Sequence, residues 1–344
     1  MKNTFTQSMA WLHTWAGLIF GWLLFAIFVT GTLAVFDKEL DHWMQPEIPA
    51  TEVPQADAAR RAIAYLQAHE PQAGNWGISL PSERSPGLRV STGERRHGPT
   101  VQLDPRTGEA IEVRDSVGGN FFFRFHFTLD LPRNWGIFVV GALALVMLAA
   151  LVTGIVIHKK IFKEFFTFRP NKGQRSWLDF HNASAVLLLP FHLMITYTGL
   201  VTLMFMYLSW AISLGFGDRN TLFETLTRQP AAVVASGEAA AMLPLQPLYQ
   251  QAKLQLSGAP IAFVAVNNPG DAAATVQFTE GSTQSLIVPG RSLMYSAVTG
   301  ELLSQQQPQL AAEHTRRAMV NLHAGRFAGQ QLRWLYFISG VMGT

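Results

Sequence analysis

Six of the ten histidines lie within or just beside long apolar segments, and they are the residues best suited to chemistry in this sequence. A single histidine in such a place is often only a hydrogen-bonded helix-packing residue. Several buried imidazoles without partners cost free energy, and coordination of a metal removes that cost. The set therefore indicates metal binding, and its members are His13, His126, His158, His181, His192 and His323.

The first and third apolar segments repeat one spacing, in which a histidine is followed at the same distance by Thr-Gly. The pairs are His13 with Thr30-Gly31, and His181 with Thr198-Gly199. Each segment leads into a long polar region that closes with a Thr-Gly-Glu turn. Because several elements recur in one order, the sequence predicts an internal duplication into two tandem units, each of helix, domain and helix.

The duplication predicts which histidines face each other. His13 and His181 are equivalent, and so are His126 and His323, each of which precedes the next apolar segment. Two facing helices of a bundle can present one imidazole to each side of a porphyrin. Each equivalent pair is therefore expected to bind one b-type haem, two in all, whereas zinc would need three or four clustered ligands.

Two further histidines fit this symmetry less well. His192 follows His181 by about three helical turns, which is about 16 Å along one helix and on nearly the same face. Leu24 holds the equivalent place in the first unit, so His192 is an additional candidate that could replace one of the paired ligands. His158 stands beside two lysines and is expected to be interfacial rather than a ligand.

Composition supports a membrane protein with a metal site that uses no thiolate. Only 14% of the residues are charged, against about 25% in soluble domains. The absence of cysteine excludes disulfides, thiolate zinc sites, iron–sulfur clusters and covalent attachment of c-type haem. The net charge of +3 is too small to indicate nucleic acid as a partner.

Apolar segments long enough to cross a lipid bilayer must position the histidines. A membrane helix needs roughly 20 apolar residues. Three segments without Asp, Glu, Lys or Arg exceed this length, namely Met9–Phe36, Trp135–Ile157 and Ala183–Phe216. The apolar stretch Trp334–Thr344 falls well short of it, so the given sequence is expected to stop inside a fourth span. The first segment is too long for a signal peptide and is expected to be an uncleaved anchor.

The loop between the second and third segments predicts the orientation. It carries one acid against six basic residues, which are Lys159, Lys160, Lys163, Arg169, Lys172 and Arg175. By the positive-inside rule this loop and the N-terminus are cytoplasmic, and both polar regions are periplasmic in a bacterial inner membrane. Docking of an acidic electron-donor protein is a second interpretation of the same charges.

The two polar regions share an order of elements. Each begins with a helix-like stretch, 56–69 or 245–256, and continues with short alternating strands, which predicts two small α+β units. The fold class is thus an α-helical membrane protein, a four-helix bundle from two repeats with two small periplasmic domains. The predicted parts alternate between membrane and loop regions and are 1–36, 37–120, 121–158, 159–180, 181–216, 217–313 and 314–344.

These motifs resemble the PepSY-associated transmembrane family of bacterial inner-membrane proteins. The matching stretches are WLHTWAGLIFGW with VTGTLAVFDKEL, FRFHFTLDLPRNWG with VTGIVIHKK, LDFHNASAVLLLPFH with YTGLV, and NLHAGRFAGQQLRWL. The polar regions resemble PepSY domains that end in a D-x-x-T-G-E turn, although the second has Ser296-Ala297-Val298 before its Thr-Gly-Glu.

The resemblance implies an activity, because some members of the family are haem-containing ferric-siderophore reductases. It implies His13, His126, His181 and His323 as ligands, with His192 of the PFH motif as a further one. The expected function is an oxidoreductase that takes electrons from an unidentified cytoplasmic or membrane donor and reduces ferric siderophores in the periplasm.

Two rival functions come from other classes. A siderophore or haem permease would need polar residues inside the spans, and few occur apart from the histidines. A non-enzymatic PepSY regulatory protein would use the spans only as anchors, which gives no reason for paired histidines.

Overall fold

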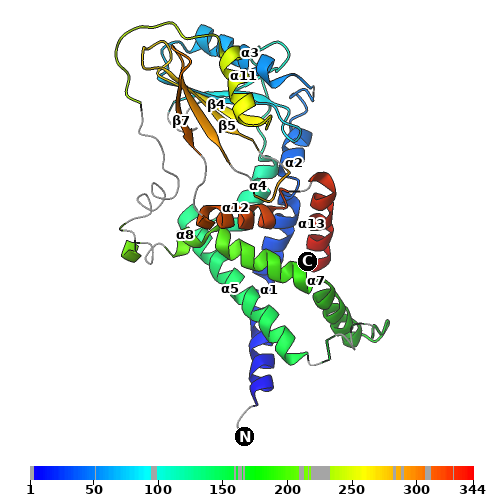
Figure 1. The fold of residues 1–344 in the computed structure, drawn as a ribbon. Helices are drawn as coiled ribbons and strands as arrows, with labels where there is room; N and C mark the ends of the chain where they lie inside the picture. Colours follow the sequence, from blue (N-terminus) through cyan, green and yellow to red (C-terminus); the bar gives the residue numbers. More distant parts are fainter. Residues whose placement is uncertain are drawn as a thin grey trace. The chain divides into compact units, whose positions relative to one another are not determined.

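In the computed structural model the chain folds into two compact units, each built from separate stretches of the sequence (Figure 1). The helical unit comprises Met1–Asp37, Gly118–Arg219 and Thr315–Thr344, and the sheet unit comprises Lys38–Val117 and Asn220–His314. The structure describes residues 4–50, 52–93, 99–158, 160–161, 165, 167–208, 213–215, 217, 233–281, 284–287, 290–306, 311–327 and 329–344. Lys159 and Lys163 of the basic loop lie outside these residues.

Three helices of the helical unit are long and apolar enough to cross a membrane. They are α1 (Phe5–Ala34), α5 (Arg133–Ile157) and α7 (Gln174–Thr202). Helix α7 begins well before the predicted third segment, runs through Pro190 and ends at Thr202. A separate short helix, α8 (Met204–Tyr207), follows it. The apolar character of these helices agrees with a lipid bilayer environment.

Shorter helices pack on the long ones. Helix α4 (Gly118–Thr128) packs against α1 and α5, and the chain then turns through two residues with positive φ into α5. Helix α12 (Ala311–Ala324) precedes α13 (Gly329–Gly343), which packs against α1 and α7. The Phe36 ring lies 4.9 Å from Trp334, measured between ring centres. Within the described ranges, three helices and not four have the length of a membrane span.

The sheet unit is one seven-stranded antiparallel sheet in the order β3-β2-β1-β4-β5-β6-β7 (Figure 1). Helix α2 (Asp37–Met44) leads into it, and helices α3 (Gln55–His69) and α11 (Leu245–Gln255) lie side by side on one face. The strands are β1 (Asn75–Ser79), β2 (Leu88–Thr92), β3 (Thr100–Leu103), β4 (Ile261–Asn267), β5 (Thr275–Glu280), β6 (Ser292–Ser296) and β7 (Leu302–Gln306).

The two polar regions, expected as two separate small domains, share this single sheet. Strands β1 and β4 join them, with Trp76 opposite Val266 and Ile78 opposite Val264. All four side chains belong to one buried cluster that includes residues of both α3 and α11. Each half alone would leave an exposed strand edge and a small core, and pairing of β1 with β4 removes both costs.

The turns that close the two halves have the same main-chain geometry despite different sequences. The Gly108 N–H donates to the Asp104 carbonyl at 2.8 Å, and the Gly300 N–H donates to the Ser296 carbonyl at 3.0 Å. Both glycines have positive φ, 82° and 78°. The Asp104 carboxylate accepts from the Arg106 N–H, and the Ser296 hydroxyl accepts from the Thr299 N–H.

A serine hydroxyl therefore replaces the carboxylate as the acceptor that organises the second turn. In the first turn, hydrogen bonds from the Arg106 side chain hold the pKa of Asp104 below its ordinary value. The second turn does without this charge.

Candidate functional site

Helix α4 places His126 against the main chain of α1. The His126 Nδ1 lies 2.8 Å from the Ile27 carbonyl oxygen. This approach requires Gly31, because a Cβ atom at that position would lie 2.5 Å from His126 Nδ1. The Thr30 hydroxyl donates to the Ala26 carbonyl at 2.7 Å, so its proton is directed along α1.

Helix α12 places His323 against α7 in the same way. The His323 Nδ1 lies 2.9 Å from the Ile195 carbonyl oxygen and 3.2 Å from the Thr198 hydroxyl oxygen. A Cβ atom at Gly199 would lie 2.8 Å from His323 Cε1. Ile195, Thr198 and Gly199 stand at the positions that Ile27, Thr30 and Gly31 occupy in the first unit, so the duplication extends to the contacts of the histidines.

His13 on α1 has a similar environment, provided by α5. The His13 Nδ1 lies 3.0 Å from the Ala150 carbonyl oxygen and 3.2 Å from the Thr153 hydroxyl oxygen. The next residue is Gly154, where a Cβ atom would lie 3.4 Å from His13 Cε1, an ordinary contact distance. Sequence reasoning missed this third Thr-Gly pair, although the repeated dipeptide in VTGT, VTGI and YTGL was available as a signal.

The structure brings together both predicted pairs of histidines. The ring centres of His126 and His323 lie 5.9 Å apart with an interplanar angle of 35°. Those of His13 and His181 lie 6.3 Å apart with an angle of 61°. His181 is an exposed residue, and its ring has no hydrogen-bond partner among the described residues.

These separations fit two imidazoles on opposite sides of one metal ion. A ligating nitrogen lies about 2.0 Å from the metal and about 1.15 Å from its own ring centre, which gives about 6.3 Å between the two ring centres. Since Nδ1 of three of the four histidines already faces an acceptor, Nε2 is the nitrogen left for ligation. The residues present therefore fit a bis-imidazole haem at each pair, although ligation itself stays a prediction.

Helices α1 and α7 also set the distance between the two pairs. On α1 this distance runs from His13 to the Ile27 carbonyl that binds His126. On α7 it runs from His181 to the Ile195 carbonyl that binds His323. The two intervals are equal, because 27 − 13 equals 195 − 181. At about 1.5 Å per residue, both helices separate the pairs by about 21 Å, most of a hydrocarbon layer of about 30 Å.

His192 belongs to neither of the two pairs of neighbouring rings. Its ring packs against Phe28 at 5.5 Å between centres, and a Cβ atom at Gly343 would lie 2.5 Å from its Nε2. The Nε2 atom is buried without a hydrogen-bond partner in the described part of the chain. No other histidine ring is found against His192 among the residues that the structure describes, and its replacement of a paired ligand stays a prediction. His158 is the residue that ends α5, and its interfacial place stays a prediction.

Clusters of ligands larger than a pair are not found in the part of the chain that the structure describes. No group of three or more His, Asp or Glu residues there lies close enough to hold a metal ion. The arrangement of paired imidazoles is the one that the duplication predicts.

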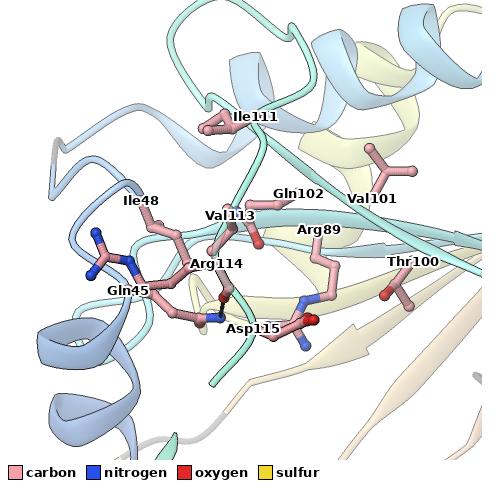
Figure 2. A pocket seen from close by; sticks show the side chains of 10 residues that line it. All are labelled: Gln45, Ile48, Arg89, Thr100, Val101, Gln102, Ile111, Val113, Arg114 and Asp115. Carbon is pink, nitrogen blue, oxygen red and sulfur yellow. Dashed lines mark hydrogen bonds between the residues drawn. The ribbon is translucent and has the colours of Figure 1, made fainter. Parts of the chain in front are cut away.

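The sheet unit contains a polar groove of about 380 Å³ that the sequence did not reveal (Figure 2). Arg89 and Gln102, paired in register on β2 and β3, line it from the strands. The segment around Arg114 also lines it, held by an ion pair with Glu47 and by a 3.0 Å hydrogen bond from Gln45 to the Arg114 carbonyl. No sequence signal predicts the groove, because its lining comes from several distant segments.

Comparison with known proteins agrees with the three apolar helices. No curated protein shows significant similarity to the chain. The model of the family described as PepSY-associated TM region matches residues 10–344. Because this match spans nearly the whole sequence, the chain belongs to the PepSY-associated transmembrane family and is a membrane protein of that type.

Proposed function

We propose that this protein is a transmembrane electron-transfer protein that holds two b-type haems and reduces ferric siderophores on the periplasmic side of the bacterial inner membrane. The observation that carries the proposal is the pairing of equivalent histidines across the repeat, with ring centres 5.9 and 6.3 Å apart. A regulatory protein that uses its helices only as anchors, or a permease, has no need for two such pairs.

The proposed reaction is a one-electron transfer. A haem held by two imidazoles supplies Fe(II)/Fe(III) chemistry and so carries one electron. The donor is a cytoplasmic or membrane reductant, and the acceptor is an iron(III) chelate, which becomes an iron(II) chelate. Siderophores bind Fe(III) through hard oxygen donors and hold Fe(II) less tightly, so reduction releases the metal.

The chain's own residues hold the proposed haem ligands in position. The carbonyls of Ile27 and Ile195 orient the rings of His126 and His323, respectively. The two pairs lie about 21 Å apart along α1 and α7, which suits transfer across most of the hydrocarbon layer. From the end of α1 near His126 the chain continues into the sheet unit, the part expected to face the arriving chelate.

Absorption spectroscopy is the first test. Purified protein is expected to show the Soret band of low-spin haem, with two haems per chain. Substitution of His13, His126, His181 or His323 by Ala should lower the haem content, whereas His69→Ala, a change in the sheet unit, should leave it unchanged. Absence of a Soret band, or full haem in all four variants, would contradict the proposed sites.

The substrate needs its own test. Protein reduced with dithionite and freed of excess reductant is mixed with a ferric hydroxamate and a ferrous chelator. Reoxidation of the protein together with trapped Fe(II) is the expected result. Protein that is oxidised by a generic acceptor but by no class of siderophore would leave electron transfer in place and remove the siderophore. Siderophore or haem uptake without reduction would favour the permease.

A further inference from the structure

We propose that three Thr-Gly pairs act as positioning residues that fix the tautomer of the histidines packed on them. Only the effect of this tautomer on haem binding rests on the proposed function. Each pair, with the carbonyl four residues before its glycine, is called a histidine seat. The three seats contain Thr30-Gly31, Thr153-Gly154 and Thr198-Gly199.

The acceptor is the same main-chain atom in every seat. The carbonyl oxygens of Ile27, Ala150 and Ile195 lie 2.8, 3.0 and 2.9 Å from the Nδ1 atoms of their histidines. Each of these residues precedes the glycine of its seat by four positions. Because the same contact recurs on three different helices, it indicates a repeated structural motif and not an incidental packing contact.

The threonine directs a second acceptor at the same nitrogen. The hydroxyls of Thr30, Thr153 and Thr198 donate to the carbonyl four residues earlier, at 2.7, 2.8 and 2.7 Å. A hydroxyl whose proton is used in this way offers only its lone pairs to another group. In two seats the hydroxyl oxygen lies 3.2 Å from Nδ1 and faces it as an acceptor.

The glycine of each seat allows the histidine ring to lie close to the helix main chain. A Cβ atom would lie 2.5 Å from the His126 ring at Gly31, 2.8 Å from the His323 ring at Gly199, and 3.4 Å from the His13 ring at Gly154. The two seats of the outer pair, His126 and His323, are therefore tight, while the seat of His13 has room for a methyl group.

The hydrogen-bond chemistry then decides the tautomer. A carbonyl oxygen can only accept, so Nδ1 of each seated histidine must carry the proton. The neutral ring keeps its lone pair on Nε2, the only atom left to bind a metal. The acceptor on the opposite nitrogen also raises the basicity of the ligand, as such contacts do in other metal sites.

Nuclear magnetic resonance of the haem-free protein tests the tautomer without reference to haem. The full chain is labelled with 15N-histidine in detergent micelles, and the signals are assigned with the variants His126→Gln and His323→Gln. Both rings are expected to carry the proton on Nδ1, whereas free neutral histidine favours protonation on Nε2. Protonation on Nε2, or a mixture of tautomers, in the unaltered protein would overturn the proposal even if haem binds.

Variants separate positioning from mere packing. Gly199→Ala should shift His323 toward a mixture of tautomers. Gly17→Ala should leave the tautomer unchanged, because no atom that the structure describes lies within 4 Å of an added Cβ atom there. In haem-loaded protein, Thr198→Val should raise the reduction potential because the ligand becomes less basic, and Thr198→Ser should restore it.

A matched threonine serves as the control for this last change. The Thr202 hydroxyl donates to the carbonyl four residues earlier at 2.8 Å, as in a seat, but within the described residues it has no hydrogen bond with a histidine. Thr202→Val should therefore leave the potential unchanged. An equal shift in both valine variants, or none in Thr198→Val, would show that the hydroxyl does not act through His323. Protein that never binds haem would instead contradict the proposed function and leave the tautomer result intact.

Discussion

Replacement of Gly31 by Ala separates a positioning role from ordinary helix packing. The added Cβ atom would lie 2.5 Å from His126 Nδ1, where ordinary contact begins near 3.4 Å, so the ring must retreat by about 0.9 Å. A retreat of that size stretches the 2.8 Å hydrogen bond to the Ile27 carbonyl beyond its useful range. Gly21 lies on the same helix, and no atom of the described residues lies within 4 Å of the place that an added methyl group would take, so Gly21→Ala is the matched control.

The magnitude follows from the displacement of the His126 ring. Overpacking, or the loss of a buried hydrogen bond, costs about 1–3 kcal/mol. The two costs are not added, because both arise from the same displacement of the His126 ring. The higher helix propensity of alanine, up to about 1 kcal/mol relative to glycine, stabilises the helix equally with and without haem and does not change haem binding. A cost of about 1–2 kcal/mol to the ligating position of His126, the lower part of the range, is a factor of about 5–30 in an equilibrium constant.

Titration of haem into the apoprotein in detergent measures this factor. Gly31→Ala should weaken haem binding at the pair of His126 and His323 about 5–30-fold, and Gly21→Ala should leave the affinity unchanged. Equal affinities in all three proteins would refute the argument that Gly31 exists to admit the ring. Equal losses in both variants would show that the helix itself, and not the seat, responds to alanine.

Further predictions concern other parts of the chain. Gly154→Ala should be tolerated with unchanged haem content, because its Cβ atom would lie 3.4 Å from the nearest ring atom; loss of haem there would contradict the graded order of the seats. Hydrogen bonds, above all from the Ser236 main chain, lower the pKa of Asp271 to about 2, below an unfolded value of about 3.9. Its carboxylate therefore stabilises the sheet unit above about pH 4, and this contribution is lost as the pH falls toward 2. Asp271→Asn should lower the Tm at pH 7, and the difference from the unaltered protein should vanish near pH 2; a difference independent of pH would refute the linkage. Reporter fusions ending at Gly108 and Gly300 should be active only as periplasmic reporters, and a cytoplasmic signal at either would overturn the predicted orientation.

Much of the helical unit could be predicted from the sequence because its signals are local or symmetric. Runs of apolar residues identify α1, α5 and α7 by length alone. The equal spacing from His13 and His181 to their Thr-Gly pairs reveals the duplication. Since equivalent positions of a repeat meet across its axis, the juxtaposition of the paired histidines follows without any knowledge of side-chain packing.

Local chemistry likewise predicted the second Thr-Gly-Glu turn. Thr299, Gly300 and Glu301 retain the residues that the main chain needs, and Ser296 accepts in place of the aspartate. Propensity for a turn depends on neighbours in the sequence, so a change of one acceptor did not alter the result.

Only the tertiary structure decided the remaining features. The pairing of β1 with β4 joins strands that lie far apart in the sequence and turns two expected domains into one sheet. The choice of the Ile27 and Ile195 carbonyls as acceptors depends on how the short helices α4 and α12 lie against α1 and α7. Strand register and helix contacts minimise exposed edges and voids over the whole molecule, and no local pattern encodes that sum.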